Sequence, residues 1–280
     1  MINALPTLDY RSVDASQAVA QSLQQSGFAV LRHSPIDPAL VAQTYQDWQA
    51  FFEGDDKVQY TFDPKIQAGY FPFQTEQAKG HSTPDLKEFF HIYEGHPLPK
   101  GIGNATWELF NQLQHLAIEL LEWVEVQAPP SIRLRFTEPL GAMIANSKET
   151  LFRLLHYPPL SDEIPPGSVR AAAHEDINLI TLLPAATSMG LELLDAEGQW
   201  QSVNCDRGDI VVNVGDMLQL ASQGFYRSTT HRVVNPDGPA RYQSRLSMPL
   251  FLHPRPEVIL AEGKTARQYL QERLREIGLV

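Results

Sequence analysis

The sequence predicts a mainly β protein with helices on both sides of a β core. Segments with helical spacing fill much of the first half and the last stretch of the chain. From about residue 150 the pattern changes to short apolar or alternating runs, separated by turns rich in Gly and Pro. Eight short strands with such turns predict a double-sheet jelly roll.

The predicted helices carry apolar residues three or four positions apart, and Gly or Pro lies near their ends. They are expected over residues 15–26, 39–52, 107–126 and 265–277. A short strand is expected over 28–31. Residues 54–105 are rich in Gly, Pro and aromatic side chains with little periodicity, so we expect loops with short elements there.

The predicted strands of the β core follow one another without a long interruption. They are expected over residues 151–157, 168–173, 178–183, 191–195, 200–203, 209–214, 229–234 and 243–252. We therefore expect one functional unit in three parts. These are a mixed α/β region over 1–149 that packs on and covers the barrel, the barrel core over 150–255, and a C-terminal helix over 256–280.

The composition excludes some classes of partner. The chain has 280 residues, 43% of them hydrophobic, and its net charge of -11 repels phosphate backbones, so no nucleic-acid partner is expected. No run approaches the roughly 18 apolar residues of a membrane span, and no membrane partner is expected. The single cysteine, Cys205, cannot form an internal disulfide, and no secretory signal is visible. Together these features predict a cytoplasmic protein.

Two histidines and an aspartate form a candidate metal site. His174 and Asp176 stand at the end of a predicted strand, where side chains two positions apart share a face, and His231 lies on a later strand. A His-x-Asp triplet arises often by chance, but of the nine histidines only His174 has a carboxylate two positions on. Two histidines and one carboxylate on one face of an ion are typical of non-haem iron(II) oxygenases, whose open positions admit O2.

Arg245 and Ser247 form a candidate anion site. On a strand over 243–252 they share a face, and a guanidinium pairs bidentately with a carboxylate while a hydroxyl adds a donor. The alternative is a surface arginine. The apolar residues Leu246 and 248–251 favour burial, and a buried arginine needs an anionic partner. Such a pair would anchor the far carboxylate of a dicarboxylic co-substrate.

These motifs, in this order, resemble the isopenicillin N synthase-like branch of the iron(II)/2-oxoglutarate-dependent oxygenases. The matching segments are His174-Glu175-Asp176, Thr230-His231-Arg232-Val233, Arg245-Leu246-Ser247, residues 154–159 and residues 179–183. Weaker matches lie at 5–9, 26–28, 69–70 and 85–88. The resemblance spans most of the chain, and the combination is specific where each segment alone is not.

The resemblance implies a double-stranded β-helix that holds Fe(II) through His174, Asp176 and His231. It implies that Arg245 and Ser247 bind the C5 carboxylate of 2-oxoglutarate and that Tyr157 also contacts this co-substrate. The implied activity is oxidation, chiefly hydroxylation, of a C–H bond of a small molecule with O2, releasing succinate and CO2. Many plant members carry Asn where this chain has Leu155, so one polar contact near the co-substrate is expected to be missing.

The substrate residues are less well defined. Candidates in the loops before the barrel and beside the metal are Tyr70, Phe71, Phe73, His81, Phe89, Arg170 and Arg227. Core packing is the alternative for the aromatic residues. Arg170 lies four positions before His174 and shares its face on a regular strand, so it could bind a substrate carboxylate or form an ordinary salt bridge. A small carboxylate such as an amino acid is the expected substrate.

Two other functions remain open from the sequence. One is an iron(II) oxidase of the same branch that does not use 2-oxoglutarate. The other is a metal-binding or sensory β-barrel without turnover, which the joint presence of Arg245, Ser247 and Tyr157 disfavours.

Overall fold

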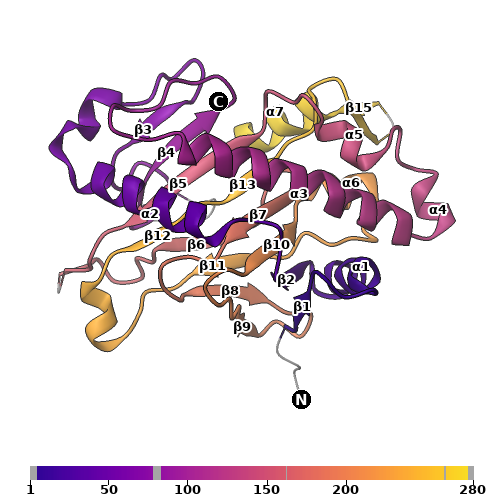
Figure 1. Ribbon diagram of the computed structural model, residues 1–280, viewed down its shortest axis with the longest axis horizontal. Coiled ribbons are helices and arrows are strands. Elements are labelled where there is room, and N and C mark those ends of the chain that lie inside the picture. Colours follow the sequence, from indigo (N-terminus) through magenta and orange to yellow (C-terminus); the bar gives the residue numbers. More distant parts are fainter. Residues whose placement is uncertain (1–4, 78–82, 162, 262, 277–280) are drawn as a thin grey trace.

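Two β-sheets face each other and helices cover the larger one in the computed structural model, which describes residues 5–77, 83–161, 163–261 and 263–276 (Figure 1). The larger sheet has the strand order β1-β2-β10-β7-β13-β5-β4-β3, with β12 also paired to β5. The smaller sheet has the order β6-β11-β8-β9. This is the double-stranded β-helix expected from the sequence.

The strands of the larger sheet are drawn from both halves of the chain. They are β1 (Thr7–Asp9), β2 (Phe28–Arg32), β3 (Gly69–Phe71), β4 (Glu88–Tyr93), β5 (Leu151–Tyr157), β7 (Ile180–Pro184), β10 (Ile210–Val214), β12 (Arg245–Ser247) and β13 (Leu250–Leu252). The smaller sheet contains β6 (Ala171–His174), β8 (Leu191–Leu194), β9 (Trp200–Ser202) and β11 (His231–Val233). A hairpin of β14 (Ile259–Ala261) and β15 (Lys264–Thr265) follows the core.

The helices lie mostly before and after the β core. They are α1 (Ala15–Ser26), α2 (Pro38–Glu53), α3 (Ala105–Gln127), α4 (Pro130–Arg133), α5 (Leu140–Ile144), α6 (Asp216–Ala221) and α7 (Ala266–Glu276), with 3-10 turns η1 (Asp55–Tyr60) and η2 (Gly238–Tyr242). Among the described helices, none combines the length and the apolar character that crossing a bilayer requires.

Side-chain alternation along β5 separates two cores. Phe152 and Leu154 point outward into the large core beneath α3, which runs along this face of the sheet in Figure 1. Leu155 and Tyr157 point inward and pack with Ala171 of the smaller sheet. Because successive side chains of a strand face opposite ways, one strand both fixes the helical layer and lines the barrel interior.

The predicted core strands all form, with one division. The expected strand over 243–252 is interrupted at Pro249, which has no N–H to donate to a ladder, so β12 and β13 are separate segments that both pair with β5. The helices expected over 15–26, 39–52 and 107–126 form with shifts of two residues or fewer. The last helix also forms, although residue 277 lies outside the described residues.

Residues 54–105 hold more sheet than expected. The strand β4 pairs with β5 over its whole length, from Glu88 opposite His156 to Tyr93 opposite Leu151. Its aromatic-rich sequence suits a strand, but the surrounding Gly and Pro hid the pattern. Because β1 to β4 extend the core sheet on both edges, the N-terminal region shares one sheet with the barrel. The division into 1–149, 150–255 and 256–280 stays a prediction.

The outward face of β5 generates a stability prediction. Phe152 is fully buried, and its ring centroid lies 6.2 Å from that of Phe110 on α3. We expect Phe152→Ala to lower the free energy of unfolding by about 3–5 kcal/mol, because the helical layer cannot close the resulting cavity. Urea denaturation measures this change. The control Val126→Ala removes a side chain that is already 64% exposed and should stay within about 0.5 kcal/mol of the parent; equal destabilisation by both variants would contradict the packing described.

Candidate metal and co-substrate site

The pairing of β6 with β11 brings the three candidate ligands together. His174 ends β6, Asp176 follows in the next turn, and His231 opens β11 directly opposite His174. Nε2 of His174 lies 3.8 Å from Oδ1 of Asp176, and Nε2 of His231 lies 3.7 Å from the same oxygen. One ligand atom from each residue falls within 4.8 Å of the others, and among the described residues this is the group of such side chains that could hold a metal ion.

Backbone carbonyls orient both imidazoles. Nδ1 of His174 lies 2.7 Å from the oxygen of Ala172, and Nδ1 of His231 lies 3.0 Å from the oxygen of Thr229. Because a carbonyl oxygen can only accept, Nδ1 carries the proton in each ring and donates it there. In a neutral ring Nε2 then keeps a free lone pair, which is what a metal ligand requires.

Two polar side chains hold Asp176. Oδ2 of Asp176 accepts hydrogen bonds from the hydroxyl of Thr181 at 2.6 Å and from the amide of Asn213 at 2.8 Å. Asn178 in turn donates to the hydroxyl of Thr181 at 2.8 Å. The other carboxylate oxygen, Oδ1, is left facing the two histidines. The sequence analysis missed these supporting residues because they lie on β7, on β10 and in a turn, with no spacing that links them to Asp176.

The charges of the cluster suit a divalent cation. Burial opposes ionisation of Asp176, but the two histidines and the hydrogen bonds from Asn213 and Thr181 keep its pKa below the ordinary value. Desolvation of the ring, followed by the effect of His231, lowers the pKa of His174 to about 4. A carboxylate oxygen and two imidazole nitrogens match the donor set of a non-haem iron(II) centre.

The three candidate ligands differ in exposure. The side chain of His174 is 40% exposed, whereas those of His231 and Asp176 are 10% and 5% exposed. Of the three side chains, that of His174 is therefore the most accessible to solvent.

Arg245 and Tyr157 meet at the other end of the barrel interior. They are directly opposite each other in the β12–β5 pair, and the Arg245 guanidinium lies 5.1 Å from the centre of the Tyr157 ring. Nε of Arg245 donates to the carbonyl of Ser188 at 3.0 Å, and the buried Nη1 has no partner. Ser247 is buried two positions on, opposite Leu155. The structure thus brings Arg245, Ser247 and Tyr157 together as the sequence predicts.

Arg170 also lies close to this tyrosine. Its guanidinium is 5.9 Å from the centre of the Tyr157 ring, and Nη2 donates to the carbonyl of Gln243 at 2.9 Å. Its side chain is buried, and Nε has no partner. Burial, and then the charge of Arg245, lower the pKa of Arg170 to about 10. Within the described part of the chain, the expected alternative of an ordinary salt bridge is not found.

The remaining substrate candidates are divided between the two faces of the sheet. Phe71 stacks on Phe89 at a centroid distance of 4.5 Å, in the inward cluster that contains Leu155 and Tyr157. Tyr70 points the opposite way, into the large core, and donates its hydroxyl to Glu88. Two other candidates, Phe73 and Arg227, are exposed, and His81 lies outside the described residues.

A buried ionic cluster that the sequence analysis missed supports β6. Oδ1 of Asp85 accepts from the backbone N–H of Ala172 at 3.0 Å, two residues before His174. Asp85 also pairs with Lys87 at 2.8 Å, and Lys87 pairs with Glu76 at 2.5 Å. This cluster ties the loop before β4 to the strand that carries the first candidate ligand.

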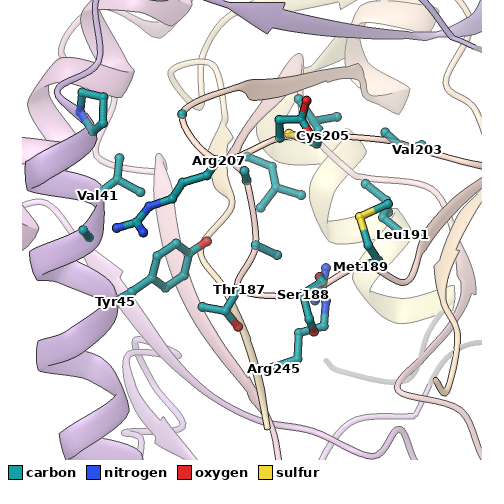
Figure 2. A pocket seen from close by; sticks show the side chains of 18 of the residues that line it. Val41, Tyr45, Thr187, Ser188, Met189, Leu191, Val203, Cys205, Arg207 and Arg245 are labelled. Carbon is teal, nitrogen blue, oxygen red and sulfur yellow. Dashed lines mark hydrogen bonds between the residues drawn. The ribbon is translucent and has the colours of Figure 1, made fainter. Parts of the chain in front are cut away.

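Arg245 also lines a cavity of about 530 Å³. Its walls come from α2 and from the segments around 183–191 and 203–211, and none of the three candidate metal ligands lines it. Figure 2 shows Arg245 and Ser188 at one end of this cavity and Arg207 well away from them. Arg245 therefore borders this cavity and also lies 5.1 Å from the centre of the Tyr157 ring.

Comparisons with known proteins agree with this geometry. Residues 148–254 match the 2OG-Fe(II) oxygenase superfamily, and residues 5–113 match the family described as non-haem dioxygenase in morphine synthesis, N-terminal. Proline hydroxylase buaE of Petromyces alliaceus is 30% identical over 92% of each chain.

Solved structures give the same result. An oxygenase structure from Shewanella oneidensis is 45% identical, with a TM-score of 0.90 over 99% of this chain and 100% of that one. Neurospora crassa T7H in complex with alpha-KG and 5-formyluracil is 26% identical, with a TM-score of 0.78 over 98% of this chain and 99% of that one.

These relatives favour the 2-oxoglutarate-dependent reaction over an oxidase that does without this co-substrate and over a barrel without turnover. They are also consistent with the isopenicillin N synthase-like branch. The chain belongs to the 2OG-Fe(II) oxygenase superfamily and is an iron(II)- and 2-oxoglutarate-dependent dioxygenase.

Proposed function

We propose that His174, Asp176 and His231 bind the iron(II) and that Arg245, Ser247 and Tyr157 bind the C5 carboxylate of 2-oxoglutarate. The observation that carries the proposal is the convergence of the three ligand atoms within 4.8 Å, with His174 the most exposed of the three side chains. The buried Arg245 with its unpartnered Nη1 supports the second half, because a buried guanidinium requires an anion.

The bound iron supplies the redox chemistry that couples O2 and 2-oxoglutarate to oxidation of a C–H bond, giving succinate, CO2 and the hydroxylated product. The residues of the chain bind, orient and exclude water. Thr181 and Asn213 hold the Asp176 carboxylate in one orientation. The apolar cluster of Phe71, Phe89 and Leu155 keeps water away from the interior.

The proposed substrate is a small molecule that enters on the His174 side. The similarity to a proline hydroxylase supports a carboxylate such as an amino acid. Phe71 is the best placed of the aromatic candidates, because its ring lies in the inward cluster. The net charge of -11 argues against nucleic acid as a substrate, and the lone Cys205 supports a cytoplasmic location.

Removal of one ligand tests the metal assignment. We expect His231→Ala to lose stoichiometric iron(II) binding and all turnover, because two remaining ligands hold the ion weakly. Anaerobic equilibrium dialysis measures the bound iron. His115→Ala, at an exposed position of α3, is the matched control and should bind iron as the parent does. Turnover by His231→Ala with iron still bound would refute the assignment.

The hydrogen bond from Asn213 to Asp176 predicts a partial loss of iron affinity when it is removed. Asn213→Ala removes the amide that donates to Oδ2 of Asp176, so we expect iron(II) affinity to fall by about 10–100-fold. A competition titration against a metal-binding dye measures the affinity. Asn111→Ala, an exposed asparagine on α3, should leave the affinity unchanged. Unaltered binding in Asn213→Ala would show that this hydrogen bond does not position the ligand.

The co-substrate assignment is tested by titrating the anaerobic iron(II) protein with 2-oxoglutarate. We expect a visible charge-transfer band when the co-substrate chelates the iron. In Arg245→Gln the half-saturating concentration should rise at least tenfold, because each charge-assisted hydrogen bond to a carboxylate stabilises the complex by about 1.5–3 kcal/mol. Arg135→Gln, at an exposed position, is the control. An iron-loaded protein that shows no band would argue against 2-oxoglutarate as the co-substrate.

A further inference from the structure

Two buried arginines lie close to one tyrosine ring, and neither has a carboxylate partner among the residues that the structure describes. Arg170 and Arg245 lie 5.9 Å and 5.1 Å from the centre of the Tyr157 ring, and they are 1% and 2% exposed. Each donates one hydrogen bond to a backbone carbonyl, from Arg170 to Gln243 and from Arg245 to Ser188. Each also has a buried nitrogen that finds no partner among the described residues, Nε in Arg170 and Nη1 in Arg245.

Burial of these two cations without an anion costs free energy. A buried cation costs free energy unless it is paired, and two like charges that sense each other add repulsion. The lowered pKa of Arg170, caused by burial and then by Arg245, reflects both effects. An anion bound between the two guanidiniums would relieve both and would accept from the unpartnered nitrogens.

The position of Arg170 along β6 identifies that anion. The strand leads from the buried Arg170, directly before its first residue, to the exposed end at His174. Four residues of strand span about 13 Å, so Arg170 is one small-molecule length from the metal cluster. A substrate must place its C–H bond beside the iron on the exposed His174 side. The buried end near Tyr157 and Arg245 is where the proposed co-substrate carboxylate lies.

We propose that Arg170 is a second arginine for the C5 carboxylate of 2-oxoglutarate, so that Arg170, Arg245 and Tyr157 form a two-cation cradle. The proposal rests on the proposed function, and it assigns Arg170 to the co-substrate in place of the substrate. Its consequence is selectivity: a 2-oxo acid without a distal carboxylate leaves both cations unpaired and binds poorly.

The test compares two ligands on the anaerobic iron(II) protein. The ligands are 2-oxoglutarate and 2-oxopentanoate, which has the same chain length but no C5 carboxylate. Isothermal titration calorimetry and the visible band report binding without turnover. In Arg170→Gln we expect 2-oxoglutarate to bind at least tenfold more weakly, while 2-oxopentanoate changes by less than about threefold, because only the former places a carboxylate in the cradle. The preference for the dicarboxylate should fall accordingly.

Arg170→Lys provides a second variant, because it keeps the charge and loses the planar fork. We expect Arg170→Lys to bind 2-oxoglutarate at least threefold more weakly and to bind 2-oxopentanoate as the parent does. This result decides the question if Arg170→Gln does not fold. Arg135→Gln, at an exposed position, should bind both ligands as the parent does.

The outcomes separate this inference from the proposed function. If Arg245→Gln weakens 2-oxoglutarate but both Arg170 variants bind it like the parent, the cradle is refuted and the co-substrate site stands. If the Arg170 variants lose only substrate-dependent succinate release, with co-substrate binding intact, Arg170 belongs to the substrate and the cradle is again refuted. If no arginine variant changes the affinity for 2-oxoglutarate, both the cradle and the proposed co-substrate site are refuted.

Discussion

The register between β6 and β11 is the constraint on which the rest of the site depends. It sets His231 directly opposite His174, and Asp176 follows in the turn after β6. A slip of one residue would turn every side chain of β11 to the other face and remove one imidazole from the interior. The pairing of β11 with β8 on its other edge, where His231 faces Leu193, fixes the same register a second time. The hydrogen bonds of β11 to both β6 and β8 therefore fix the position of His231 relative to His174.

The interior is electrically asymmetric along its length. The ionised Asp176 lies at the open end, and the unpaired Arg170 and Arg245 lie at the buried end. A cation is favoured at the first end and an anion at the second. A dicarboxylate suits both ends once a cation is bound at the first, because one carboxylate then pairs with that cation and the other pairs with the two arginines. The distribution of charges along the interior thus supports a dicarboxylate co-substrate.

The sequence predicts those relations between residues that depend on their spacing along one strand. The relation of His174 to Asp176, or of Arg245 to Ser247, needs only the two-residue period of a strand, so these positions were predictable. The support of Asp176 by Thr181 and Asn213 depends on sheet order, which no local pattern contains. The same holds for Tyr70, whose face is fixed by the register of β3 on β4 and not by its aromatic character. Local spacing and the family motifs therefore predicted the meeting of His231 with His174, but not the supporting contacts around Asp176.

The N-terminal region contributes more to the site than a cover. Asp85 accepts from the backbone of Ala172, so β6 is held from outside the smaller sheet as well as by β11. Asp85 is itself held by Lys87, which Glu76 neutralises in turn. These residues precede or begin β4, which pairs with β5 along its whole length. Because β5 also carries Tyr157, a single chain of contacts links the first candidate iron ligand, the loop before β4 and the buried end of the interior. Asp85 and Lys87 therefore support both ends of the site, although neither is a candidate iron ligand.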